Sequence, residues 1–205
     1  DASLNMQIHL DQRCKLNGSY NGGTGITTFT LPYTVATGLQ CINAATGSDL
    51  TIASQSGTTV TVEGNIASAY FGFQYTTLYT LSTQYIREPG KVGGLVSLTA
   101  GRLQVRTMSF DYAGTGFFQV VVAHNNRDDK TYTFNGYIID SSASLIERPV
   151  LTDGTFRVPI QAKNTDHTVS IKSSSYLPVN LVSAEMEGFY YRRSTRVWNT
   201  YSKKS

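Results

Sequence analysis

Glu185 and Glu187 are two carboxylates whose spacing could serve the hydrolysis of a sugar chain. They alternate along the run 181–191, which has the pattern of a β-strand, and residues two apart in a strand lie about 7 Å apart. Glycosidic hydrolysis uses two carboxyl groups roughly 5–10 Å apart, one on each side of the scissile bond. Alternate residues of a strand point the same way, so a partner on another element would be needed, and none is evident. An exposed strand face or a salt bridge between subunits explains the pair better, and we keep it as a candidate site only for a carbohydrate-active protein.

Each of the three histidines has an acidic residue nearby in the sequence: His9 with Asp11, His124 with Asp128 and Asp129, and His167 with Asp166. His9 and Asp11 would share one face of a strand and could supply two metal ligands. No third ligand follows at the spacing that a metal site requires. We expect a surface pair on a strand for the first group and a solvated hairpin tip for the second.

The common motifs of nucleophilic catalysis and phosphate binding are absent from the sequence. There is no G-x-S-x-G elbow, no supported Ser-His-Asp order and no G-x-x-x-x-G-K-[ST] loop. The glycine-rich run 22–25 is expected to be a turn, with no helix after it to bind an anion. We predict a protein that is not an enzyme and that uses no cofactor and no metal.

Cys14 and Cys41 are the only cysteines, too few for a disulfide framework and without a second pair for a zinc site. We expect reduced thiols, in the core or on the surface. A single bridge between adjacent strands stays open, because pairing depends on geometry that the sequence does not supply.

Basic residues are concentrated at the end of the sequence. Of 17 basic residues, five fall in the last 14 positions, which contain no acid, so residues 1–191 carry 12 basic against 14 acidic side chains. DNA binding requires a basic surface on folded elements, which a near-neutral body does not offer. The candidate contacts, to another subunit or to DNA, are Arg192, Arg193, Arg196, Lys203 and Lys204.

Short runs of period-two alternation recur along the chain, separated by turn residues, as in half-buried antiparallel strands. Phe71, Phe73 and Tyr75 share one face of such a run and are expected to be core residues, although an aromatic row can also stack on sugars. No helix is predicted beyond one turn at 141–147. The expected strands are 7–10, 27–31, 40–43, 50–53, 58–63, 70–75, 102–112, 117–124, 131–139, 154–161, 168–173 and 181–191.

The segment from Glu88 to Gly94 is the strongest turn signal and predicts a domain boundary or a long hairpin. We predict an all-β fold of two antiparallel sandwich-like or barrel-like domains, 1–90 and 91–191, followed by a basic C-terminal tail, 192–205. No apolar run is long enough for a membrane-spanning helix. The sequence starts in mid-pattern without Met, so we expect a longer N-terminal region to precede it.

An ordered set of segments resembles the C-terminal region of the tail tubular protein B, or nozzle protein, family of T7-like short-tailed bacteriophages. No single segment is diagnostic, but the set spans nearly the whole chain. The segments are LDQR at 10–13, TFTLPY at 28–33, FGFQY at 71–75, YIRE at 85–88, GRLQVR at 101–106, TGFFQV at 115–120, GTFRVP at 154–159, LP at 177–178, SAEMEG at 183–188 and RRS at 192–194.

This resemblance implies a structural virion protein that forms a hexameric ring, the distal conduit of the tail through which DNA is ejected. It implies as partners other copies of the chain, a tail adapter protein, tail fibres, the passing DNA and the bacterial envelope. The protein would assemble in the host cytoplasm and reside in the virion tail. The family offers no catalytic residues to transfer.

Two other hypotheses compete with this one. The 13 tyrosines and the Glu185/Glu187 pair would suit a phage module that binds or degrades envelope polysaccharide. A DNA-gripping protein would instead use Arg192, Arg193 and Arg196.

Overall fold

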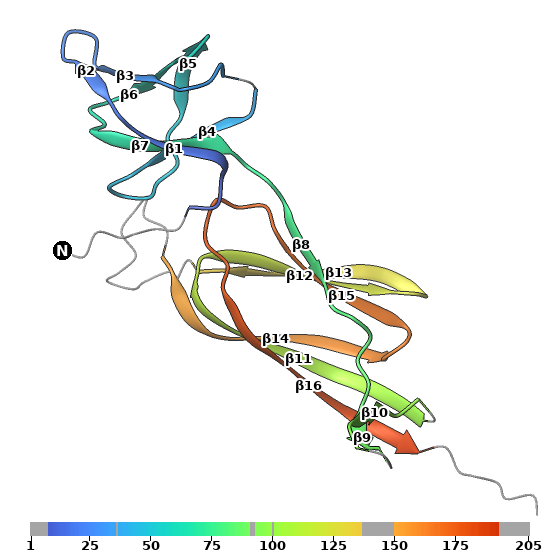
Figure 1. Ribbon diagram of the computed structural model, residues 1–205. Helices are drawn as coiled ribbons and strands as arrows, with labels where there is room; N and C mark the ends of the chain where they lie inside the picture. The colour runs from blue at the N-terminus through green and yellow to red at the C-terminus, as the bar shows by residue number, and fades with distance from the viewer. Residues whose placement is uncertain (1–7, 36, 91–92, 100, 137–149, 193–205) are drawn as a thin grey trace, which may run out of the picture.

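The computed structural model describes residues 8–35, 37–90, 93–99, 101–136 and 150–192, and these residues form strands and no helix (Figure 1). All strand pairings are antiparallel, which confirms the predicted all-β fold. None of the described segments is a helix of the length and apolarity that a membrane crossing requires. The predicted helical turn at 141–147 lies outside the described residues.

The first sandwich is built from two sheets, with strand orders β1-β7-β4 and β2-β3-β6-β5. Its core is filled by alternate residues, Val60 and Val62 from one sheet and Cys41 and Phe71 from the other. The phenyl rings of Phe29 and Phe71 meet edge to face at 5.0 Å between centroids. The strands are β1 (Asp11–Asn17), β2 (Ser19–Asn21), β3 (Ile26–Thr30), β4 (Leu39–Asn43), β5 (Ile52–Ser56), β6 (Thr59–Glu63) and β7 (Ser68–Phe73).

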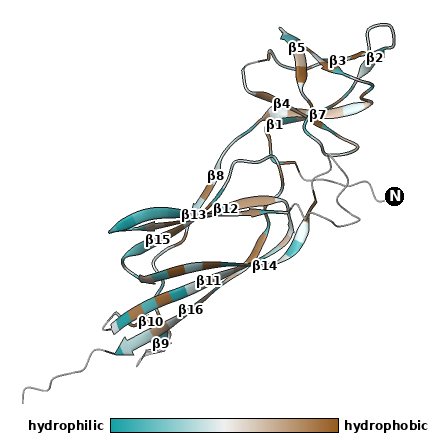
Figure 2. Cartoon of the chain, turned by 180° about the vertical axis from the view of Figure 1, so that it is seen from behind, coloured by the Kyte–Doolittle hydropathy of each residue, from teal (hydrophilic) through white to brown (hydrophobic). Residues whose placement is uncertain are grey.

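The second sandwich packs the sheet β14-β11-β16 against the sheet β13-β12-β15-β8. Hydrophobic and hydrophilic residues alternate along β11 (Figure 2), so that Val105, Met108 and Phe110 are buried between the sheets. The strands are β8 (Thr77–Thr80), β9 (Arg87–Pro89), β10 (Leu95–Ser97), β11 (Gly101–Thr115), β12 (Phe117–His124), β13 (Arg127–Asn135), β14 (Thr152–Lys163), β15 (His167–Ser173) and β16 (Leu181–Arg192).

A small apolar cluster joins the two sandwiches, which lie end to end in Figure 1. Ile8, Leu10 and Ile42 are buried there against Tyr70 and Tyr176. The predicted strand at 7–10 is therefore wrong for its described residues, 8–10, and β1 begins at Asp11. The side chains of Ile8 and Leu10 are both buried in this junction. The backbone N–H of His9 donates to the Tyr176 carbonyl at 2.8 Å instead of to a strand partner.

Other predicted elements are confirmed with shifted limits. The turn signal around Glu88–Gly94 is a hairpin, because β9 pairs with β10. The hairpin tip expected after His124 is the turn Asn125–Asn126, and β13 starts at Arg127. Phe71 and Phe73 pack on the first core as predicted, but Tyr75 lies beyond the end of β7 and is 44% exposed. The division into domains at residues 90 and 191 stays a prediction; β8 pairs with β15 of the second sandwich.

Cys14 and Cys41 are free thiols on opposite sides of one strand. Both pair with Phe71 of β7, which lies between β1 and β4. Two strand spacings separate their Cα atoms by about 10 Å, whereas a disulfide requires less than about 7 Å. The bridge that the sequence left open is therefore excluded, and the reduced state of both thiols stays a prediction.

Cys41 is expected to resist alkylation in the native protein. Burial, together with the charge of Asp49, raises the pKa of the Cys41 thiol to about 12, and its side chain is fully buried. The reactive thiolate is therefore almost absent at pH 8. Iodoacetamide labelling followed by mass spectrometry should modify Cys41 only after denaturation. Rapid labelling of two thiols in the native chain would contradict this prediction.

Candidate functional site

Glu185 and Glu187 lie on the outer, exposed face of β16, and no cleft flanked by a second carboxylate faces them among the described residues. Ala184 and Met186 alternate with the glutamates and stand opposite the buried residues Phe110 and Met108. Because neighbouring side chains of a strand point to opposite faces, the glutamates point away from the sandwich. Glu187 pairs with Arg157 at 3.6 Å and with Arg106 at 4.0 Å, all with exposed side chains. This is a solvated strand face with ion pairs of little energetic weight.

Asp111 is a third carboxylate on this face, and the sequence did not point to it. Its Oδ2 accepts a hydrogen bond from the Ser183 hydroxyl and its Oδ1 one from the Thr155 hydroxyl, both at 2.6 Å. These two bonds lower the pKa of Asp111. A general acid needs a raised pKa, so Asp111 does not complete a hydrolytic pair with Glu185. The three residues come from β11, β14 and β16, and only strand pairing brings them together.

Arg192 is the one member of the predicted basic set that the structure describes. It ends β16 opposite Gly101, and its guanidinium donates to Glu88 Oε1 at 2.9 Å. Arg193, Arg196, Lys203 and Lys204 lie outside the described residues. The described end of the chain is therefore tied to the β9–β10 hairpin.

The strand pair expected for His9 is not formed, whereas His124 ends β12 at a hairpin turn as expected. His9 is not on a strand with Asp11 but lies at an apolar groove. His124 stands opposite His167, a pairing across β12 and β15 that sequence spacing does not reveal. His167 is buried and its Nδ1 lies 2.8 Å from the Lys163 carbonyl oxygen. Among the described residues no cluster of three or more histidine, cysteine or acidic residues could hold a metal ion.

His124 is expected to make the protein less stable in mild acid. Burial and the positive charges of Arg127, His167 and Lys130 lower its pKa against the opposing effect of Asp129. The folded state therefore binds a proton less readily than the unfolded chain, whose histidines titrate near pH 6.5. Stability is retained above about pH 6.5 and falls as the pH drops toward the folded-state pKa.

A His124→Gln variant should therefore lose part of this pH dependence. Urea unfolding measured between about pH 7.5 and pH 5 should give a flatter stability profile for the variant than for the parent. The same slope in both proteins would contradict the assignment to His124.

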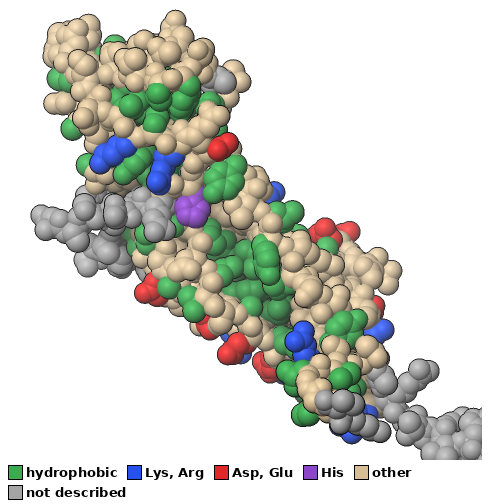
Figure 3. Space-filling view, viewed as in Figure 1, with side chains coloured by type: hydrophobic (Ala, Val, Ile, Leu, Met, Phe, Trp, Pro, Cys, Tyr) green, Lys and Arg blue, Asp and Glu red, His purple; other side chains and the backbone are tan. Residues whose placement is uncertain are grey.

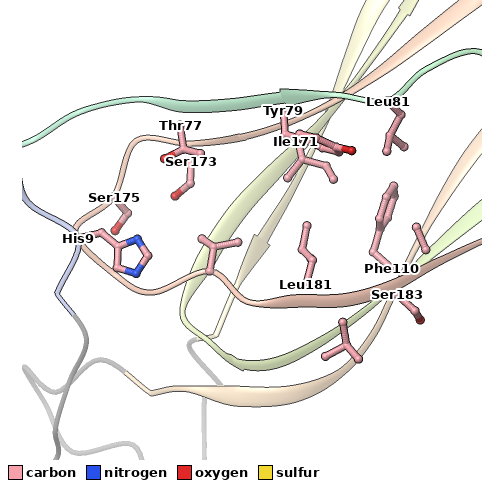
Figure 4. Close-up of a pocket in the computed structure, with 13 residues that line it drawn as sticks. His9, Thr77, Tyr79, Leu81, Phe110, Ile171, Ser173, Ser175, Leu181 and Ser183 are labelled. Carbon is pink, nitrogen blue, oxygen red and sulfur yellow. The ribbon is translucent and has the colours of Figure 1, made fainter.

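A groove runs along the open side of the second sandwich (Figure 3). The groove consists of three adjoining cavities of about 440, 360 and 180 Å³. The first and second share Tyr79, Leu81 and Ala184, and the second and third share Met186. One wall runs from β8 to Tyr85 and the other is β16. Figure 4 shows Phe110 and Ile171 between these walls.

The groove exposes residues that strand register assigns to the core. Tyr79 pairs with buried Ile171, and Met186 pairs with buried Met108. Tyr79 is nevertheless 62% exposed and Met186 40% exposed, because none of the described strands lies between β8 and β16. On the opposite side of the sandwich, Phe134 of β13 closes the gap by packing on Phe156 of β14. We call the open side, with its walls β8–Tyr85 and β16, the edge groove.

Comparison with known proteins agrees with the resemblance seen in the sequence. A family model described as bacteriophage nozzle protein matches residues 1–197. The chain is also 29% identical over 138 residues to the tail tubular protein gp12 of Escherichia phage T7. That alignment covers 66% of this chain and 17% of the length of the relative. The chain therefore belongs to the bacteriophage nozzle protein family, a family of phage tail proteins.

Proposed function

We propose that this chain is a non-enzymatic part of a hexameric tail nozzle that forms the distal conduit for DNA ejection. The observation that carries the proposal is the family match over residues 1–197. The matched relative is a tail tubular protein, and a tube requires copies that contact one another in a closed ring. The role is then one of shape and assembly in the virion tail, after synthesis in the host cytoplasm.

The charge distribution supports a conduit. Residues 1–191 carry 12 basic and 14 acidic side chains, so the body is near neutral. A basic lumen would hold DNA by releasing its counterions and would slow passage.

The two separate hydrophobic cores support a division into two β domains. Other copies, a tail adapter protein, tail fibres and the bacterial envelope are the proposed contacts.

The ring should be visible in the complete protein that contains this chain. Native mass spectrometry and negative-stain imaging, alone and with the adapter protein, are expected to show six copies in a closed ring. A complete protein that stays monomeric in the presence of its adapter would overturn the proposal.

The alternative of a polysaccharide-binding or polysaccharide-degrading module has less support. Its candidate residues, Glu185 and Glu187, lie on an exposed face, and Glu187 is paired with two arginines. Incubation with capsular polysaccharide tests this alternative, and absence of turnover removes the enzyme. If turnover is seen but persists in Glu185→Gln and Glu187→Gln variants, the proposed site is removed.

A DNA-gripping role would depend on Arg192, Arg193 and Arg196. Arg192 is already engaged by Glu88, which weakens its use as a phosphate contact. Deleting residues 192–205 and measuring DNA retention tests this role, and unchanged retention dismisses it.

A further inference from the structure

We propose that the edge groove receives residues 193–205 of a neighbouring copy of this chain as an added β-strand. The inference rests on the proposed function, since it names the contact by which adjacent copies in the nozzle hold one another. It extends that function by assigning a donor segment and an acceptor surface.

The edge groove has the features of a strand acceptor. β8 ends one sheet and β16 ends the other, so each has an edge whose backbone N–H and C=O groups no strand pairs within the described residues. Between these edges the core residues Tyr79 and Met186 are exposed. An incoming strand would bond to an edge through its backbone and cover the apolar hollow with alternate side chains. The cavity of about 440 Å³ is lined mainly by apolar side chains, whereas the adjoining cavity of about 360 Å³ is more polar and includes Arg87. A contiguous apolar hollow such as the first is a typical interaction surface.

The segment 193–205 suits this groove in length, composition and charge. It is 13 residues long, or about 43 Å when extended. This is longer than the stretch 181–188 of β16 that lines the groove. In an extended strand Trp198 points to one face and Val197 and Tyr201 point to the other, so Trp198 is the apolar side chain that would enter the groove. Its charged residues are all basic: Arg193, Arg196, Lys203 and Lys204.

The face beside the groove carries charges of both signs, but two of its carboxylates form no ion pair within the described residues. Asp111 and Glu185 lie on the outer face of β11 and β16, the sheet that ends at the groove, and neither is in an ion pair within the described residues. Figure 3 shows acidic side chains beside the apolar hollow. With Trp198 facing the groove, a strand added along β16 would place Arg193 and Lys203 on the outer face, beside Glu185 and one strand away from Asp111, so charge complementarity favours this placement.

A neighbouring copy, not the same chain, is the donor. β16 is paired with β11 up to Arg192, so its own continuation would have to reverse at once to return along the free edge. Two-residue hairpin turns strongly prefer Gly, Asn or Asp at their centre. The stretch 192–198 contains none of these residues. A segment that leaves one copy and enters the groove of the next makes the head-to-tail contact from which a closed ring is built.

Trp198 is the single tryptophan and reports on this contact without a label. As the concentration of the 205-residue chain rises, its fluorescence emission should shift to the blue, because Trp198 enters an apolar groove. Ala184→Arg places a bulky cation where two of the cavities adjoin, and Val182→Arg places one in the first cavity, at a side chain that is 67% exposed. Each should move the midpoint of the shift to at least about tenfold higher concentration.

The matched control is Thr131→Arg, which adds the same charge on β13 at the opposite edge of the sandwich. It should leave the midpoint unchanged, and circular dichroism should show that all variants are folded. The inference is overturned by a blue shift that does not depend on concentration, which would mean that the chain fills its own groove. It is also overturned if the parent shows no shift up to about 1 mM, or if Val182→Arg and Thr131→Arg behave alike.

Failure of this inference differs from failure of the proposed function. Rings of the complete protein that form equally well with Ala184→Arg would remove the groove contact and leave the nozzle role intact. A groove-dependent Trp198 shift with no ring in the complete protein would do the opposite.

Discussion

Replacing Phe118 by alanine is expected to lower the free energy of unfolding by about 3–5 kcal/mol. Phe118 is fully buried at the centre of the second sandwich. Its phenyl ring lies 5.0 Å from that of Phe134 and 5.4 Å from that of Phe156, measured between centroids. Truncation removes these contacts and leaves a cavity that aromatic neighbours on three strands cannot fill without moving.

Phe189→Ala is the matched control for this experiment, because it removes the same side chain from the same sandwich. Phe189 lies on β16 and is 53% exposed, so its loss should change the unfolding free energy by no more than about 0.5 kcal/mol. Urea denaturation monitored by circular dichroism measures both variants. Similar losses in the two variants would contradict the placement of the core.

Replacing Gly18 by alanine is expected to destabilise the first sandwich by about 1–3 kcal/mol. Gly18 joins β1 to β2, and its N–H donates to the Ala67 carbonyl at 3.0 Å. An added Cβ would overlap the carbonyl oxygen of Ile66, the Thr27 side chain and the Phe29 ring. Two of these neighbours are fully buried and the third is backbone, so none can yield without disturbing the crossing between the sheets.

Gly22→Ala provides the comparison for Gly18. It lies in the turn after β2, where the atom nearest to an added Cβ is Tyr20 Cε1 at 3.9 Å, an ordinary contact. Because alanine restricts the unfolded chain, Gly22→Ala should leave the free energy of unfolding unchanged or raise it by up to about 1 kcal/mol. Thermal unfolding of the two variants distinguishes the close approach at Gly18 from a general loss of glycine flexibility. Equal melting temperatures would contradict the prediction.

The family and the fold class were accessible from the sequence. Alternation such as that of Val60 and Val62 requires only local geometry, because side chains in a strand point to opposite faces in turn. The ordered segments pointed to the nozzle family, which the family match over residues 1–197 confirmed. The reading of Glu185 and Glu187 as an exposed strand face also needed only the spacing of two residues, and the structure places them there.

Local pattern failed where long-range packing outweighs it. Ile8 and Leu10 alternate as residues of a strand would, but they are buried in the junction between the sandwiches, where Tyr176 packs against their cluster. Tyr75 continues an aromatic row that ends because β7 ends at Phe73.

The features that matter for assembly were decided only by tertiary structure. Asp111 meets Ser183 across 72 residues, and His124 meets His167, because of which strands pair. The edge groove exists because β8 and β16 end their sheets and no strand of the described part of the chain lies between them. Period-two alternation shows which side chains face inward, but it cannot show whether a second layer is there to cover them. Strand order determines that cover, and with it the surface that another copy can bind.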